Sequence, residues 1–278
     1  MVKELREKTG AGMMDVKKAL TEADGDVARA KEIIRAKGIQ AAGKREGRKA
    51  QEGTIASTVI DSAAGQTGYA VELNSETDFV AKTPKFIDFA DTVLADAVKA
   101  GADDIDAVLA APSQDGTVKE AVEEASALFG EHVKVGQFAK IEGPKVEIYA
   151  HKKSVEMPPS IVAMIATDEA GAAVAHEAAL QISAMGAQWL TRDDVPEDVV
   201  ETERRVATEK SLAEGKPEKI VPKIVEGRLN AFFKENVLLE QAYVKDPSKT
   251  IGDLFKEVGG QALAFARLEV GKAPEADA

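Results

Sequence analysis

Residues 54–74 have the sequence TIASTVIDSAAGQTGYAVELN, and this stretch decides the fold. Its first seven residues are rich in β-branched side chains and alternate roughly between apolar and polar, which is typical of a strand. Residues 64–68 contain two glycines and supply a turn, and residues 69–74 return as a second strand. The stretch therefore predicts an antiparallel β-hairpin.

The residues after this hairpin predict helices and a third strand. Thr83 suits the N-cap of a helix and Pro84 its first position, and apolar side chains then recur on one face as far as Val98. A further helix is expected near residues 117–129, and residues 133–142 have the pattern of a strand. Residues 54–143 are thus expected to form a small sheet covered by helices, a subdomain of the α+β class.

The second half of the chain repeats this plan. Its predicted strands and helix occupy residues 146–151, 160–166, 170–185 and 263–271. The closing strands at 136–143 and 263–271 even have similar sequences. Two such units indicate an internal duplication, with the second subdomain formed by residues 144–195 and 234–271.

An insertion interrupts the second subdomain. Residues 196–233 contain two charged helical patterns separated by Gly215-Lys216-Pro217, and they predict an antiparallel helical hairpin. The side chains expected to pair across it are Val199, Val206 and Leu212 with Ile220, Ile224 and Leu229. Because a hairpin of this kind is too thin to enclose a core, it is a candidate surface for homodimerisation or for gripping a partner.

Residues 1–40 predict a small bundle of three helices. Apolar periodicity places them at about residues 2–8, at 13–23 and from Val27 to Gly38, and Asp26 suits the N-cap of the third. Such a short bundle is marginal on its own and is expected to lean on a partner.

Two segments show no pattern of regular structure. Residues 41–53 lack a sustained apolar face and are expected to be a linker. Its basic side chains, Lys44, Arg45, Arg48 and Lys49, are expected to be solvated, with contact to an acidic partner as the alternative. Residues 272–278 are expected to be a disordered tail.

Composition narrows the classes of function. The 278 residues carry a net charge of −12, although residues 1–52 hold 13 Lys/Arg against 9 Asp/Glu. An acidic protein is expected to repel phosphate backbones, which disfavours nucleic-acid binding. There is no cysteine, so disulfides and Cys-ligated metal sites are excluded. No apolar run approaches the roughly 18–20 residues of a membrane span, and the N-terminus lacks the apolar stretch of a secretory signal. These features predict a cytoplasmic protein that does not bind membranes.

The sequence contains no recognisable catalytic motif. It lacks a phosphate-binding Gly-x-x-x-x-Gly-Lys-Ser/Thr loop, a dinucleotide-binding glycine pattern and a Gly-x-Ser-x-Gly nucleophile elbow. His132, His151 and His176 are scattered and match no metal-ligand spacing. The chain is therefore expected not to be an enzyme and to need no cofactor or metal.

The densest group of carboxylates lies in residues 72–81, ELNSETDFVA. Glu72, Glu76 and Asp78 could hold a hard cation, but their spacing does not match a calcium loop. A structural role is favoured by the pattern: Ser75 caps a short helix, Asp78 is its capping-box partner at the third position, and the two apolar residues that follow pack inward.

Two long motifs carry a resemblance to a known family. Residues 5–20, LREKTGAGMMDVKKAL, and residues 72–81 are similar to the two sequence signatures of bacterial elongation factor Ts. Shorter segments at residues 215–217, 225–228 and 247–251 match in the family's order. The resemblance covers nearly the whole chain, and two long motifs at the right separation are highly specific.

The resemblance implies a function and a fold. Members of the family are guanine nucleotide exchange factors for the translation GTPase elongation factor Tu. They have an N-terminal bundle that resembles a ubiquitin-associated domain, two related α+β subdomains and a projecting helical hairpin. Longer members carry a further helical module after the last strand, and this chain is expected to lack that contact.

The resemblance also implies which residues bind the partner. The exchange element corresponds to Thr77, Asp78, Phe79 and Val80. Phe79 is expected to insert between two helices of the GTPase domain and to displace the groups that hold Mg²⁺ beside the nucleotide, so that GDP leaves faster. Further contacts with the partner are expected from Arg6, Met13, Met14 and His151.

Two other functions are alternatives to nucleotide exchange. A general binding or chaperone module would use the bundle and the hairpin without affecting nucleotide exchange, and it would keep its function without Phe79. A metal-dependent hydrolase built on Glu72, Glu76 and Asp78 would bind a divalent metal stoichiometrically. The resemblance favours the exchange factor over both.

Overall fold

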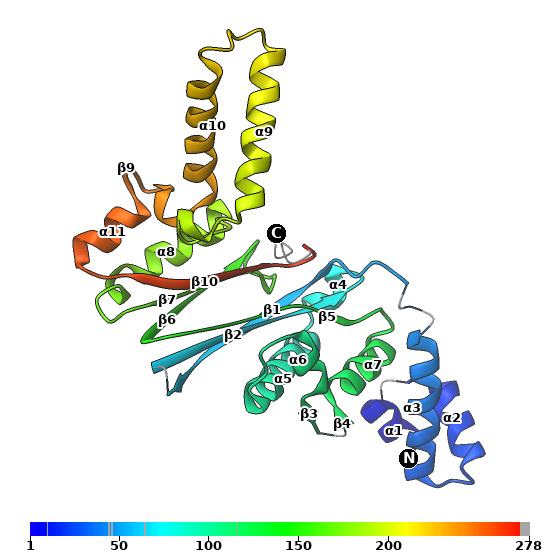
Figure 1. Ribbon diagram of the computed structural model, residues 1–278. Coiled ribbons are helices and arrows are strands. Elements are labelled where there is room, and N and C mark those ends of the chain that lie inside the picture. The colour runs from blue at the N-terminus through cyan, green and yellow to red at the C-terminus, as the bar shows by residue number, and fades with distance from the viewer. Residues whose placement is uncertain (10, 44, 46, 64, 115, 273–278) are drawn as a thin grey trace.

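The computed structural model describes residues 1–9, 11–43, 45, 47–63, 65–114 and 116–272. Within these ranges the chain forms an N-terminal helical bundle, a core of two antiparallel sheets with helices on their outer faces, and a projecting helical hairpin (Figure 1). This arrangement confirms the predicted α+β class. No helix in the described ranges is long and apolar enough to cross a membrane. The tail predicted at residues 272–278 lies outside the described residues, apart from Lys272.

The N-terminal bundle consists of α1 (Val2–Thr9), α2 (Met13–Glu22) and α3 (Val27–Gly43). One residue from each helix, Leu5, Val16 and Ala30, is almost fully buried at its centre. Asp26 caps α3 as predicted, because its carboxylate accepts two backbone N–H groups of the first turn at 2.8 and 3.1 Å.

The third helix is longer than predicted. It continues past Gly38 to Gly43, and the next strand begins at Glu52, so both ends of the expected linker at residues 41–53 are regular structure. Gly38 lies where α3 packs on a helix of the core, and a Cβ added to it would lie 2.9 Å from the Cβ of Ala127. The glycine therefore permits a close helix contact and does not end the helix.

The first sheet contains β1 (Glu52–Ser62), β2 (Gly65–Ser75) and β5 (Lys134–Gly143), antiparallel in the order β1-β2-β5. Its outer face is covered by α5 (Pro84–Ala100), α6 (Ile105–Ala110) and α7 (Val118–Phe129). A short ribbon of β3 (Pro112–Ser113) and β4 (Gly116–Thr117) joins α6 to α7. The predicted cap of α5 is confirmed, since the Thr83 hydroxyl accepts the backbone N–H of Phe86 at 3.3 Å.

The second sheet repeats the first. It contains β6 (Lys145–Lys152), β7 (Pro159–Thr167) and β10 (Ala262–Glu269), antiparallel in the order β6-β7-β10. Its outer face is covered by α8 (Ala172–Met185) and α11 (Ile251–Val258), and a ribbon of β8 (Ala242–Tyr243) and β9 (Asp246–Thr250) precedes α11. In each sheet the second strand along the chain is the central one, as the predicted duplication requires.

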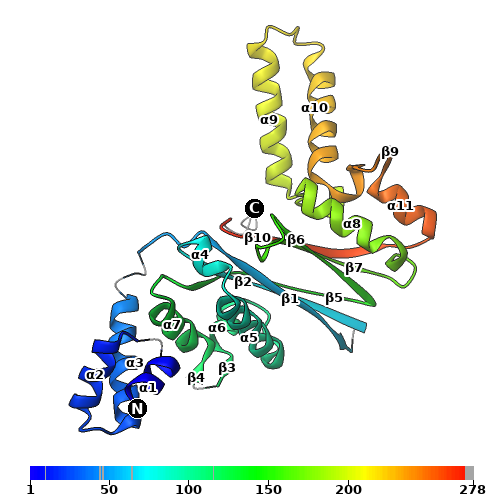
Figure 2. The same ribbon diagram turned by 180° about the vertical axis from the view of Figure 1, so that it is seen from behind.

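The two sheets pack face to face, between the two sets of covering helices (Figures 1 and 2). Ala70 of β2 belongs to the apolar cluster between the sheets, with Val162 and Met164 of β7, whereas Val71 belongs to the cluster under the helices. Because side chains alternate along a strand, β2 is covered on both faces, and its residues 67–75 are all buried.

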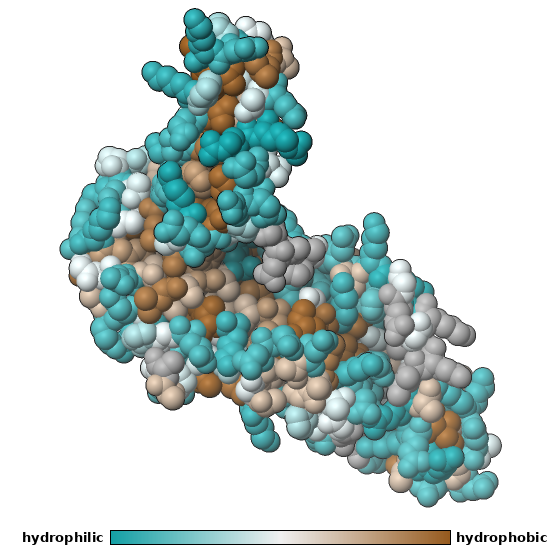
Figure 3. Space-filling view, in the orientation of Figure 1, coloured by the Kyte–Doolittle hydropathy of each residue, from teal (hydrophilic) through white to brown (hydrophobic). Residues whose placement is uncertain are grey.

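The inserted hairpin is formed by α9 (Glu197–Ala213) and α10 (Val221–Asn236). Its seam differs from the prediction: Val206, Leu212 and Ile220, which were expected to pair across it, are about half exposed. The buried residues of the seam are Ala207, Ser211, Val221, Val225, Leu229 and Phe233. Small side chains on α9 allow the two helices to approach closely, and the larger apolar ones are left on the surface. Figure 3 shows apolar surface along the hairpin.

A buried carboxylate joins the two sheets at one end of the core. Glu72 is 1% exposed, and its oxygens accept the side-chain amides of Asn74 and Gln137 at 2.6 Å each and the N–H of Gly271 at 2.8 Å. Gln137 also donates to the carbonyl of Glu269, at the end of β10, at 2.8 Å. Since protein donors occupy both of its oxygens, Glu72 holds the ends of β2, β5 and β10 together.

Gly136→Ala is expected to disrupt this network and to lower the free energy of unfolding of the protein by roughly 1–3 kcal/mol, the usual cost of overpacking. A Cβ at Gly136 would lie 2.1 Å from Asn74 Oδ1 and 2.6 Å from Glu72 Oε2. Urea unfolding of the purified variant measures the change. The matched control is Gly227→Ala inside α10, where a Cβ would have no atom of the described chain within 4 Å. That change is expected to stabilise the protein by up to about 1 kcal/mol. Equal effects of the two changes would contradict the steric argument.

Candidate partner-binding site

The segment between β2 and α5 forms a one-turn helix, α4 (Asp78–Ala81). Thr77 is its N-cap, and the Thr77 hydroxyl accepts the backbone N–H of Val80 at 3.4 Å. Ser75, the cap expected from the sequence, instead ends β2, where it is fully buried and donates its hydroxyl to the Thr77 carbonyl at 3.0 Å. The predicted cap was therefore wrong, and Asp78 is the first residue of the helix.

Phe79 is presented to solvent by this helix. Its side chain is 71% exposed, whereas Ala81 is fully buried and Val80 packs partly against the core under the helices. One helical turn cannot direct all its side chains toward the core, so burial of Val80 and Ala81 leaves Phe79 outside. The interpretation from the local pattern, that Phe79 packs inward, was wrong; the resemblance predicts a partner contact instead, and the exposed ring is available for one.

A weak ion pair flanks the exposed ring. The Lys82 Nζ atom lies 4.6 Å from the centroid of the Phe79 ring and 3.6 Å from a carboxylate oxygen of Asp78. Both charged side chains are well exposed, so the pair restrains the ring little. The surface formed by these three residues is aromatic at its centre, with one acidic and one basic group beside it.

Hydrogen bonds tie the segment before α4 to the turn after α7. Thr77 donates its N–H and its hydroxyl to Glu131 at 3.0 and 2.6 Å. Glu76 accepts the N–H of His132 at 2.7 Å and the guanidinium of Arg48 at 3.4 Å. The His132 N–H and, secondarily, Arg48 hold the pKa of Glu76 below its ordinary value, so the carboxylate is ionised at neutral pH. Its contribution to stability is therefore lost as the pH falls through that lowered pKa.

The residues expected to bind a partner on the bundle are exposed. Met13 and Met14 begin α2 and are 52% and 62% exposed, and Arg6 is exposed on α1. Val16, in the next residues of α2, is fully buried. The two methionines therefore lie outside the core of the bundle, as residues available for contact would.

His151 belongs to a different part of the chain. It lies near the end of β6 in the second sheet and is half-buried, with its Nδ1 atom 3.3 Å from the hydroxyl of Tyr149. The predicted site residues thus come from three places: the bundle, α4 and the second sheet.

Helix α4 and the bundle lie toward the same end of the molecule. Glu52 at the start of β1 pairs with Ser75 at the end of β2, so α4 lies close to the point where the chain arrives from α3. Figures 1 and 2 both show α4 and the bundle at this end, whereas the hairpin of α9 and α10 projects from the part of the core that carries α8.

The three carboxylates of the hydrolase alternative do not converge. Glu72 is enclosed between the sheets, Glu76 is bonded to the turn after α7, and Asp78 is on the exposed surface beside Phe79. Among the described residues, no three His, Asp or Glu side chains are grouped so that they could hold a metal ion. The arrangement does not favour that alternative.

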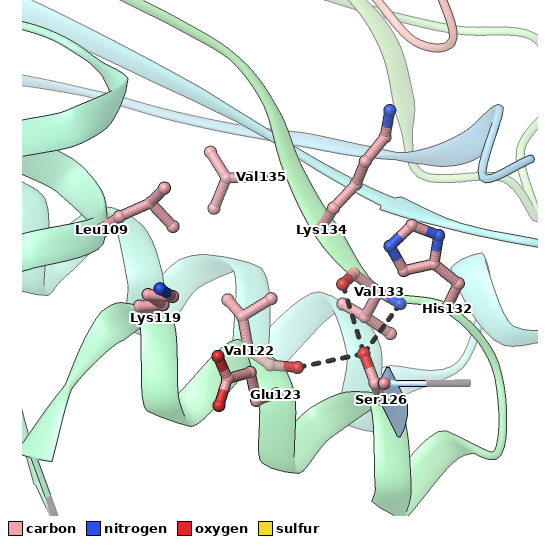
Figure 4. A pocket seen from close by; sticks show the side chains of 10 residues that line it. Leu109, Lys119, Val122, Glu123, Ser126, His132, Val133, Lys134 and Val135 are labelled. Atoms are coloured by element: carbon pink, nitrogen blue, oxygen red, sulfur yellow. Dashed lines mark hydrogen bonds between the residues drawn. The ribbon is translucent and has the colours of Figure 1, made fainter. Parts of the chain in front are cut away.

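A shallow cavity of about 290 Å³ lies beside the turn after α7 (Figure 4). Val122, Val133 and Val135 contribute apolar side chains to its lining, with His132 also beside it. Ser126, another lining residue, already accepts the N–H of Val133 at 2.9 Å and donates to the carbonyl of Val122 or Val133 at 3.2 Å. Because this hydroxyl is satisfied within the protein, we assign the cavity to the packing of α7 against β5.

Sequence reasoning missed Glu131. It bonds to Thr77 although 54 residues separate them along the chain. The local sequence gives one indirect signal, Gly130, which ends α7 with a φ of 73° and turns the chain toward α4.

Known proteins are similar to this chain over its whole length. The sequence model of the family described as Elongation factor TS matches residues 76–272. Elongation factor Ts of Bifidobacterium animalis subsp. lactis is 98% identical over 278 residues, which are 100% of this chain and 98% of that protein. Elongation factor Ts of Bifidobacterium adolescentis is 82% identical, and the aligned residues cover 98% of this chain and 96% of that protein. The protein of the same name from Beutenbergia cavernae is 51% identical over 97% of both chains.

Proposed function

Because the chain belongs to the elongation factor Ts family, we propose that it is a guanine nucleotide exchange factor of translation. It binds elongation factor Tu in complex with GDP and accelerates the release of GDP. It acts in the cytoplasm, without covalent chemistry and without a cofactor of its own.

One observation carries this proposal at the level of residues. Phe79 is 71% exposed on a helix whose neighbouring residues, Thr77 and Ala81, are anchored by hydrogen bonds and burial. An exposed aromatic side chain on a fixed support is what a protein needs to insert a ring between elements of a partner. The flanking Asp78 supplies a charged group at the edge of the same contact.

The proposed mechanism acts on the Mg²⁺ ion of the GTPase. Insertion of Phe79 shifts the partner's groups that hold the ion beside the nucleotide phosphates. Loss of the cation removes much of the charge that neutralises the β-phosphate, so GDP dissociates faster. Thr77 and Val80 form the remainder of the inserted loop, while Arg6, Met13, Met14 and His151 bind other parts of the partner.

The test is the release of a fluorescent GDP analogue from purified elongation factor Tu, with and without this protein. Acceleration is expected, together with reciprocity: if the protein weakens GDP binding, GDP must weaken binding of the protein by the same factor. The affinity for nucleotide-free elongation factor Tu should therefore exceed that for the GDP complex. Equal affinities for the two forms would contradict the proposal and favour a simple binding module.

We also propose that the hairpin is the surface for self-association of the chain. Val206, Leu212 and Ile220 leave apolar side chains about half exposed on it. Substitution of all three by Ser is expected to shift sedimentation-velocity profiles toward the monomer and to leave GDP release unchanged. A wild-type protein that sediments as a monomer at all accessible concentrations would contradict this assignment.

A further inference from the structure

We propose that Glu131 is a positioning residue for nucleotide exchange. Its carboxylate holds Thr77 and, through Thr77, the helical turn that carries Phe79. This inference rests on the proposed function and extends it to a residue that acts through the inserted loop.

The contact between Glu131 and Thr77 uses both oxygens of the carboxylate. Oε2 accepts the Thr77 N–H at 3.0 Å, and Oε1 accepts the Thr77 hydroxyl at 2.6 Å. Two parallel hydrogen bonds to an acidic side chain fix both the position and the orientation of the group that they hold. Glu131 thus restrains the backbone and the side chain of Thr77 together.

Thr77 in turn determines the geometry of α4. Its carbonyl accepts the N–H of Ala81 at 3.2 Å, and its hydroxyl oxygen accepts the N–H of Val80 at 3.4 Å. Since the hydrogen of that hydroxyl is directed to Glu131, its lone pairs are left to face Val80. Loss of Glu131 would free the hydroxyl to rotate and Thr77 to move, and Phe79 would lose its fixed direction.

Glu131 is itself held from both sides. Gly130 ends α7 in the left-handed conformation, with a φ of 73°, immediately before it. Immediately after it, the His132 N–H donates to Glu76 at 2.7 Å, and the Val133 N–H donates to Ser126 at 2.9 Å (Figure 4). The segment before α4 and the turn after α7 are therefore joined by reciprocal hydrogen bonds. Glu76 of the segment accepts a hydrogen bond from the turn, and Glu131 of the turn accepts hydrogen bonds from the segment.

Helix α7, which leads into this turn, also supports the bundle. Arg35 of α3 forms an ion pair with Glu124, and Arg45 donates to the carbonyl of Ser126 at 3.2 Å. The turn therefore connects the support of the bundle to the support of Phe79. A rigid connection of this kind fixes the position of the proposed binding surface on the bundle relative to that of Phe79.

The experiment compares Glu131→Ala in the wild-type and the Phe79→Ala backgrounds. The maximal rate of GDP release and the concentration that gives half of it are measured with elongation factor Tu. In the wild-type background, Glu131→Ala is expected to lower the maximal rate about tenfold, because a small misplacement of a functional group has large kinetic effects. In the Phe79→Ala background it is expected to change the rate less than twofold, since there is no ring left to position.

Two further variants separate positioning from folding. Glu131→Gln keeps the volume of the side chain but replaces one acceptor by a donor, and it is expected to lower the maximal rate in the same direction. Glu123→Ala removes a carboxylate from α7, the helix that precedes the turn with Glu131, and lies outside the two connected segments; it is expected to leave the rate unchanged. Thermal unfolding of every variant is recorded beside the kinetics.

The outcomes distinguish the two proposals. An equal fold-loss in both backgrounds would show that Glu131 does not act through Phe79 and would overturn the inference. A wild-type rate for both Glu131 variants, beside an active wild type, would overturn it as well. A wild-type protein that does not accelerate GDP release would instead contradict the proposed function.

Discussion

Phe79→Ala is expected to lower the acceleration of GDP release roughly 10- to 100-fold. Burial of a Phe side chain in the partner is worth about 1.5–3 kcal/mol, and about 1.4 kcal/mol corresponds to a factor of ten. Because Phe79 is 71% exposed in the free protein, its removal is expected to leave thermal unfolding nearly unchanged. The measurement is the release rate of a fluorescent GDP analogue at saturating concentrations of each protein.

The control for this variant is another exposed apolar residue. Leu128 on α7 is 44% exposed and has no role in the proposed contact, so Leu128→Ala is expected to exchange GDP at the wild-type rate. If Phe79→Ala kept full activity, the ring would not be the inserted group, and the protein would act through its binding surfaces alone. A parallel loss in both variants would indicate a general effect of removing apolar surface.

The sequence was enough to propose residues 77–80 as the site segment, but it did not predict the geometry of that segment. Ser75 and Thr77 are both good helix caps by residue type, and the choice between them depends on where β2 ends. That end is set by the pairing of Ser75 with Glu52 of the neighbouring strand, a contact that no local pattern specifies. The same error placed Phe79 inside the protein, since the direction of a one-turn helix follows from its first residue.

Contacts between residues far apart in the sequence explain the other differences between prediction and structure, at Glu72 and in the hairpin. The strand pattern alone could have placed Glu72 on the same face as Ala70 and Asn74, but not the two donors to Glu72 that come from β5 and from the residues after β10. In the hairpin, apolar periodicity favours Val206 as the residue of the seam, whereas close helix packing favours its small neighbour Ala207. The predicted α+β class needed only local periodicity and repetition, and these were sufficient.

Replacement of both Met13 and Met14 by Gln is expected to raise the half-maximal concentration for GDP release roughly 10- to 100-fold. The two side chains are 52% and 62% exposed at the start of α2, and we propose that they become buried on the partner. Their loss removes apolar burial of about 1.5–3 kcal/mol. Because we propose that the bundle binds the partner both before and during exchange, the maximal rate is expected to stay at the wild-type value.

A raised half-maximal concentration at unchanged maximal rate is the opposite of the pattern expected for Phe79→Ala, which lowers the rate at saturating protein. Glutamine keeps the length and the helix propensity of methionine, so α2 should remain folded in the double variant. Met185→Gln, at the end of α8 and 51% exposed, is the matched control and is expected to change neither parameter. A double variant that lost maximal rate at unchanged half-maximal concentration would show that the bundle takes part in displacing the nucleotide. The proposal that α2 only binds the partner and that α4 alone displaces the nucleotide would then be wrong.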